Sequence, residues 1–77
     1  MAYATNEERL QMVNTAFGLD FVVQIKTWRG ESEIACENFE HAFDTAYTWK
    51  HVHGAEHVQM YRVDQRDGSL YGGIGSW

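Results

Sequence analysis

The chain has 77 residues, a formal net charge of −5 at pH 7 and a single cysteine. This length suits one domain spanning residues 1–77, and one cysteine excludes a scaffold held by internal disulfides. Direct binding of nucleic acid or of an anionic membrane needs clustered positive charge, which six scattered lysine and arginine residues do not supply, so we expect neither. No stretch approaches the ~20 apolar residues of a membrane span and the first residues do not read as a signal peptide, so we expect a cytoplasmic protein.

The first predicted element is a helix over residues 6–17. Thr5 and Glu8 have the spacing of a capping box, in which each side chain accepts a hydrogen bond from the backbone amide of the other residue. Leu10 and Phe17 follow at helical spacing, and a glycine comes directly after the predicted end.

Two strands are predicted next, over residues 21–28 and 32–36. The first segment alternates two sets of side chains and is dominated by β-branched and aromatic residues, which favour strands. Arg29, Gly30 and Glu31 are expected to form the turn between the two segments.

The clearest helical periodicity lies over residues 39–53, where apolar residues recur at spacings of three and four. We expect this stripe to face the core; it consists of Phe39, Ala42, Phe43, Ala46, Trp49 and His53. Asn38 is a favourable N-cap residue, and Gly54 follows the predicted end of the helix.

Residues 57–63 and 69–77 both read as strands, and Asp67-Gly68 between them is a short-range hairpin signal. The second of these segments contains three glycines, which mark bulges or close backbone approach. The element order is therefore α-β-β-α-β-β. The predicted fold is α+β, with two helices packed on one face of a small antiparallel sheet.

Acidic residues dominate the middle of the chain, because no lysine or arginine occurs between residues 31 and 48. The acidic residues of this segment are Glu31, Glu33, Glu37, Glu40 and Asp44. The last three share one side at the start of the predicted helix, where carboxylates interact favourably with the helix dipole. Two interpretations stay open: a solvated acidic face, or a ridge of carboxylates that binds a basic protein surface.

Aromatic residues make up 14% of the chain, more than one small core can enclose. We therefore expect some of them at the surface, where aromatic side chains are the usual anchors of protein interfaces. Trp28, Tyr47 and Trp77 are the candidate anchors.

A histidine cluster is the candidate metal site. His51, His53 and His57 lie close together in the sequence, and zinc is bound by such residues when three or four of them converge. The alternative is structural, because histidine near the end of a helix is favoured by the helix dipole. Cys36 has glutamates nearby, which disfavour a reactive thiolate, and we expect it to be a buried apolar residue.

The part of the chain from residue 21 to residue 77 resembles small acidic accessory and inhibitor proteins encoded by phages, anti-CRISPR proteins among them. The segments that carry the resemblance are Lys26-Thr27-Trp28, Phe39-Glu40-His41-Ala42-Phe43, the run Val58-Gln59-Met60-Tyr61-Arg62-Val63-Asp64, and Asp67-Gly68. The likeness is one of size, charge and element order. It implies a protein that binds and inhibits host defence or transcription machinery.

We therefore expect a protein-binding inhibitor, without enzymatic activity or cofactor, that docks through its acidic surface on a nucleic-acid-handling host protein with a basic surface, such as a CRISPR–Cas component. Two alternatives stay open. One is a self-associating protein that forms a homodimer through its glycine-rich edge strand. The other is a metal-binding domain that uses the three clustered histidines.

Overall fold

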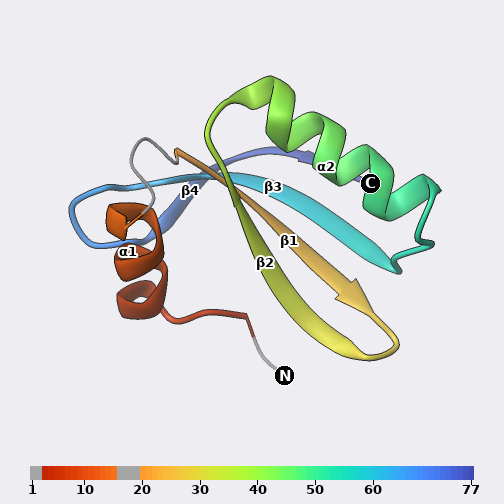
Figure 1. Ribbon diagram of the computed structural model, residues 1–77, viewed down its shortest axis with the longest axis horizontal. Helices are drawn as coiled ribbons and strands as arrows, with labels where there is room; N and C mark the ends of the chain where they lie inside the picture. The colour runs from red at the N-terminus through yellow and green to blue at the C-terminus, as the bar shows by residue number, and fades with distance from the viewer. Residues whose placement is uncertain (1–2, 16–19) are drawn as a thin grey trace.

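The computed structural model describes residues 3–15 and 20–77. Its elements, in chain order, are α1 (Asn6–Thr15), β1 (Phe21–Thr27), β2 (Gly30–Cys36), α2 (Phe39–His51), β3 (His57–Val63) and β4 (Leu70–Ser76) (Figure 1). The predicted α+β class and the order α-β-β-α-β-β are confirmed. The predicted end of the first helix, at residue 17, lies outside the described residues. Within these residues no helix is long and apolar enough to cross a membrane.

The strands form one antiparallel sheet in the order β2-β1-β3-β4. β1 and β2 form a tight hairpin in which Thr27 pairs with Gly30, so that Trp28 and Arg29 occupy the turn. The second strand therefore begins two residues earlier than its sequence predicts. β2 and β4 are the two edges of the sheet.

α2 covers one face of the sheet. Its buried residues are Ala42 and Ala46, whose small side chains let the helix lie close to the strands. They pack with Val23 and Ile25 of β1 and with residues of β3. The side chain of Asn38 accepts a hydrogen bond from the His41 amide at 2.8 Å, which confirms the predicted N-cap.

α1 lies against the opposite face, so the prediction that both helices pack on one face is not confirmed. Leu10 of α1 packs with Val22 and Val63, whereas α2 packs with Val23. Because successive residues of a strand point to opposite faces, the side chains of Val22 and Val23 lie on the two different faces of the sheet. Figure 1 shows the two helices on either side of the sheet. The reason lies in β1, where two consecutive valines are fully buried and each needs its own cover.

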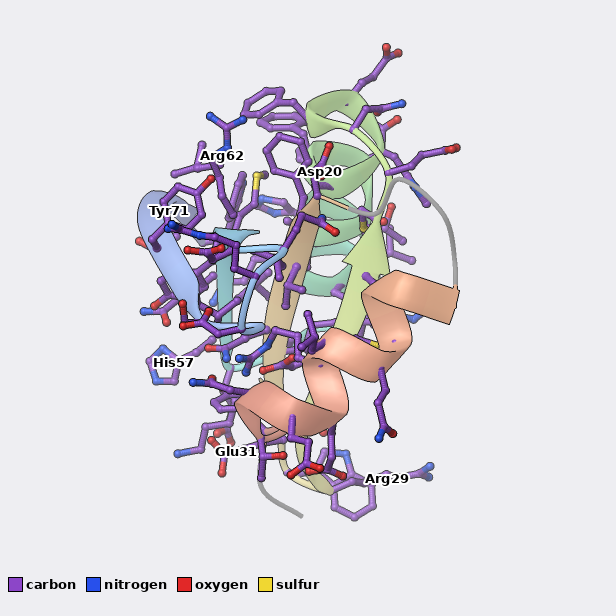
Figure 2. All side chains as sticks on the ribbon, turned by 90° about the vertical axis from the view of Figure 1, so that its left-hand side faces the viewer. Asp20, Arg29, Glu31, His57, Arg62 and Tyr71 are labelled. Carbon is purple, nitrogen blue, oxygen red and sulfur yellow. The ribbon has the colours of Figure 1, made fainter. Side chains whose placement is uncertain are left out.

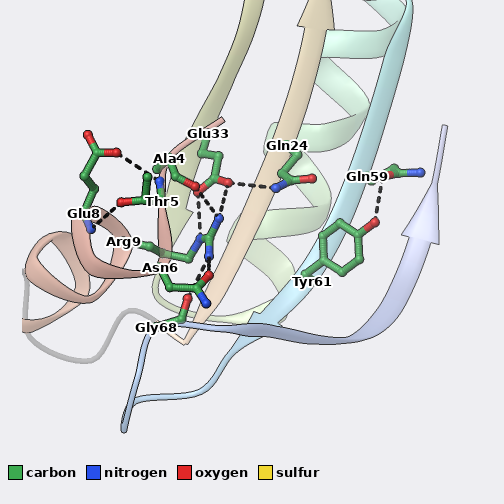
Figure 3. A network of polar contacts seen from close by, with 10 residues as sticks. All are labelled: Ala4, Thr5, Asn6, Glu8, Arg9, Gln24, Glu33, Gln59, Tyr61 and Gly68. Carbon is green, nitrogen blue, oxygen red and sulfur yellow. Dashed lines mark hydrogen bonds and ion pairs between the residues drawn. The ribbon is translucent and has the colours of Figure 1, made fainter. Parts of the chain in front are cut away.

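α1 is held in place by a buried ion pair (Figure 3). Arg9 donates hydrogen bonds to both carboxylate oxygens of Glu33 at 2.9 and 2.6 Å, and the exposed fractions of the two side chains are 5% and 1%. The Arg9 guanidinium also binds Asn6 Oδ1 and the carbonyl oxygens of Ala4 and Gly68.

The predicted capping box at the start of α1 is confirmed: the Thr5 amide donates to the Glu8 carboxylate, and the Glu8 amide donates to Thr5 Oγ1.

The β3–β4 connection is longer than the predicted two-residue hairpin at Asp67-Gly68 and spans residues 64–69. The Gly68 amide donates to the Asp64 carbonyl, and the Asp64 amide donates to the Ser69 carbonyl, both at 2.8 Å. Gly68 has a φ of 78° and is buried, and a Cβ atom there would collide with the backbone of Asn6. This glycine lets the loop reach Arg9, so it serves a contact between distant segments as well as the turn.

Candidate protein-binding surface

The five acidic residues of the middle segment do not form one continuous ridge, which corrects the prediction. Glu31 and Glu33 belong to β2 and pair in register with Lys26 and Gln24. Glu33 is neutralised by Arg9 and receives a further hydrogen bond from Gln24 at 2.7 Å. It is therefore a structural residue and is not available to a partner.

Glu31 is half-buried and lies near the N-terminal segment. Burial and the Glu31 carboxylate raise the pKa of the Tyr3 phenol above its usual value. Glu31 therefore interacts within the chain and does not extend the acidic surface of α2.

The remaining acidic residues are exposed at the start of α2: Glu37 precedes the helix, and Glu40 and Asp44 lie in it. We call these three the acidic row. Among the described residues the ion pairs are Arg9–Glu33 and Asp64–Arg66, so the acidic row has no internal counter-charge.

Beside the acidic row, α2 carries a row of exposed aromatic side chains. Phe39, Phe43 and Tyr47 follow one another at intervals of four residues, and their exposed fractions are 49%, 42% and 51%. Successive residues of a helix are separated by about 100°, so Glu40 and Asp44 run alongside Phe39 and Phe43. The predicted stripe is confirmed for Ala42 and Ala46, which are buried against the sheet, but Phe39 and Phe43 lie at its exposed border.

Ring contacts join this aromatic row to the sheet. Phe39 stacks on Phe43 with a centroid distance of 6.2 Å and meets Phe21 edge-on at 6.3 Å. Phe43 meets Trp77 edge-on at 5.6 Å, and the Arg62 guanidinium lies 5.5 Å from the Phe21 ring centroid. The exposed rings are thus held in place by their neighbours, which reduces the entropy that binding would have to remove.

Of the three candidate anchors, Tyr47 alone belongs to this surface. Trp77 is half-buried, packs against the core and lies over Gly75, where a Cβ atom would approach the indole ring to 3.0 Å. Trp28 is 81% exposed, with the Arg29 guanidinium 4.9 Å from its ring centroid, but it lies at the tip of the β1–β2 hairpin. The length of β1, about 20 Å, separates this tip from Phe21.

The clustered histidines point to different neighbours. The His51 ring lies 4.5 Å from that of Tyr47, and the His53 ring lies 4.8 Å from that of Trp49. His57 begins β3 and pairs in register with Lys26. Throughout residues 3–15 and 20–77, no three side chains of the metal-binding types are grouped to hold a metal ion.

Cys36 is buried, and its thiol lies 3.8 Å from the Thr45 hydroxyl and from the Ile34 carbonyl oxygen. Burial raises the pKa of the thiol, so the reactive thiolate is disfavoured. This environment matches the structural role expected from the sequence.

A hollow of about 510 Å³ lies at the end of the sheet where β1 begins and β3 ends. It is lined by Asp20, Arg62, Val63, Asp64, Gln65, Arg66 and Tyr71. Figure 2 shows Asp20, Arg62 and Tyr71 at this end and Arg29 and Glu31 at the other. Arg66 is paired with Asp64, and Gln65 donates to Asp20 at 2.9 Å, so three of the four charged residues that line the hollow already have partners in the chain.

No protein-family model matches the sequence, and no curated protein or solved structure matches it either.

Proposed function

We propose that this chain is a protein-binding domain that docks on a basic protein surface through α2. The observation that carries the proposal is the pairing of two rows on one helix: exposed, pre-positioned aromatic rings and carboxylates without internal counter-charges. Large aromatic side chains supply apolar area that becomes desolvated on binding, and the adjacent carboxylates select positive charge.

Interface energy is usually concentrated in a few aromatic anchors, and truncation of one of them typically costs 2 kcal/mol or more, about 30-fold in affinity. Phe43 is the central ring of the row and is therefore the expected anchor. The acidic row accelerates association with a basic partner, and salt screens this effect.

The partner class that fits this surface best is a protein that handles nucleic acid, since such proteins carry clustered lysine and arginine where the phosphates bind. A carboxylate-bearing helix that covers such a site competes with the nucleic acid. On this proposal the chain is an inhibitor that acts by occupancy, without enzymatic chemistry or cofactor.

The test compares proteins captured from a bacterial lysate by the immobilised wild-type chain and by variants. Phe43→Ala and Asp44→Lys change the proposed surface. Trp28→Ala and Glu7→Lys are the matched controls, because they remove an exposed aromatic residue and reverse an exposed acidic residue elsewhere. A genuine partner is retained by the wild type and both controls and is lost with both surface variants.

The affinity of the purified partner is then measured by calorimetry at low and high salt, together with the displacement of a fluorescent oligonucleotide from it. We expect binding to weaken at least tenfold with Phe43→Ala and to weaken with salt, and we expect the oligonucleotide to be displaced. Equal retention by surface variants and controls would refute the docking proposal. Binding without displacement would refute inhibition and leave docking standing.

A further inference from the structure

The second exposed feature of the molecule is the free edge of the sheet at β4. β4 pairs with β3 on one side only, and most of its residues are exposed. Natural proteins usually protect such an edge with charged residues, with proline or by covering it. From Gly68 to Trp77 the chain has no charged residue and no proline, so this edge lacks the first two protections.

The backbone groups that remain free at this edge follow from the ladder. Trp77 exchanges two hydrogen bonds with Val58, and Gly75 pairs in register with Met60. In an antiparallel ladder the intervening residues point their backbone groups the other way. Ile74 and Ser76 therefore direct their amide and carbonyl groups outward, away from β3.

We propose that the C-terminal half of β4 pairs with the same segment of a second copy, antiparallel across a two-fold axis, to form one continuous sheet. Ile74 of each copy would lie opposite Ser76 of the second copy. The register shift between Met60 and Arg62 disturbs the other half of β4, which is why we place the contact beyond it.

Charge distinguishes a second copy from other occupants of this edge. A two-fold interface brings identical surfaces together, so any charged patch would meet itself. In a chain of net charge −5, the edge at β2 carries Glu31 and the exposed side of α2 carries the acidic row. The uncharged β4 segment is where two copies meet without this repulsion, and it offers no carboxylate to attract the basic partner proposed above.

The side chains near the edge also suit self-pairing. Ile74 is 38% exposed, and the position of Gly72 is open space with nothing within 4 Å of an added Cβ atom. An approaching strand thus meets a bare backbone and one apolar side chain, which association would bury.

Sedimentation equilibrium of the wild-type chain over a range of concentrations is the test. We expect a mass twice that of the 8.9 kDa chain at high concentration. Ile74→Lys places charge against charge at the two-fold contact and should weaken the dimer at least tenfold. Ser32→Lys, the matched control on the other edge strand, should leave it unchanged.

Hydrogen exchange of the wild-type chain supplies a readout that does not depend on any variant. The amides of Ile74 and Ser76 should exchange more slowly at high concentration than at low concentration. A monomeric mass at all concentrations would overturn the proposal, and so would a dimer that both lysine variants weaken equally. Phe43→Ala should leave the dimer intact, so failure here is distinct from failure of the docking proposal.

Discussion

The buried ion pair between Arg9 and Glu33 provides the most direct test of how this fold is held together. Replacing Arg9 by methionine keeps an apolar stem of similar length and removes five donated hydrogen bonds. The Glu33 carboxylate, 1% exposed, is then left with the hydrogen bond from Gln24. Removing one partner of a buried pair typically costs about 3–5 kcal/mol, because the other charge stays buried without compensation.

This cost is large for so small a domain. At about 0.05–0.15 kcal/mol per residue, the whole free energy of unfolding is roughly 4–12 kcal/mol. A loss of 3–5 kcal/mol corresponds to a fall in Tm of roughly 12–40 °C. We therefore expect Arg9→Met to be partly unfolded at 37 °C, as measured by urea and thermal denaturation followed by circular dichroism.

The double variant Arg9→Met, Glu33→Met separates charge from shape. It removes both buried charges, so the remaining loss is that of the hydrogen bonds to the loop and to the N-terminal segment, about 1–3 kcal/mol. It should be more stable than Arg9→Met alone. As a control, Arg66→Met removes the exposed pair with Asp64 and should leave Tm unchanged. The reasoning is refuted if Arg9→Met costs less than 1 kcal/mol, or if the double variant is the less stable of the two.

The remaining predictions concern caps, the thiol and the tryptophans. Asn38→Ala removes the cap of α2 and should lower the free energy of unfolding by about 1 kcal/mol in urea denaturation. The hydrogen bonds from Thr5 lower the pKa of Glu8 from its ordinary 4.5. The stability from this carboxylate is therefore present above pH 4.5 and is lost as pH falls through the lowered pKa. In a pH series of melting curves, the Tm of Glu8→Gln should depend less on pH in that range than the Tm of the wild type. At pH 8 the Cys36 thiol should react with a disulfide reagent at least about 100-fold more slowly in the native protein than in urea, and an equal rate would contradict its burial. Trp77→Ala should lower the free energy of unfolding by about 2 kcal/mol or more, because the ring of Trp77 packs on the core. Trp28→Ala should change it by no more than about 0.5 kcal/mol, because Trp28 is exposed. A reversed order in urea denaturation would show that the two roles are misassigned.

The elements were predictable where the signal is local. The capping box, the Asn38 cap and the alternation of β3 each depend on residues a few positions apart, and the structure confirms them. The placement of α1 was not predictable in this way. Its main anchor joins Arg9 to Glu33 across 24 positions, and in the sequence Glu33 resembles every other acidic residue of its segment. Consecutive valines at the start of β1 were the one available sign that both faces of the sheet are covered.

The candidate surface was predictable in kind but not in its residues. Excess aromatic content correctly indicated exposed rings, but periodicity placed Phe39 and Phe43 on the core-facing stripe, and both are about half exposed. The small side chains of Ala42 and Ala46 let the helix lie close over β1 and β3.

The distribution of side-chain size supports a functional reason for the exposed rings. The largest fully buried side chains among the described residues are those of Ile25 and Met60, and no aromatic residue is among them. A domain this small buries a modest share of its surface and gains stability from each large apolar residue that it encloses. Yet Phe39, Phe43 and Tyr47 stay about half exposed on α2, fixed by ring contacts and flanked by carboxylates that lack internal counter-charges. Both features forgo stability in the isolated chain, and the basic partner proposed above would account for both at once, because it would cover the rings and neutralise the carboxylates.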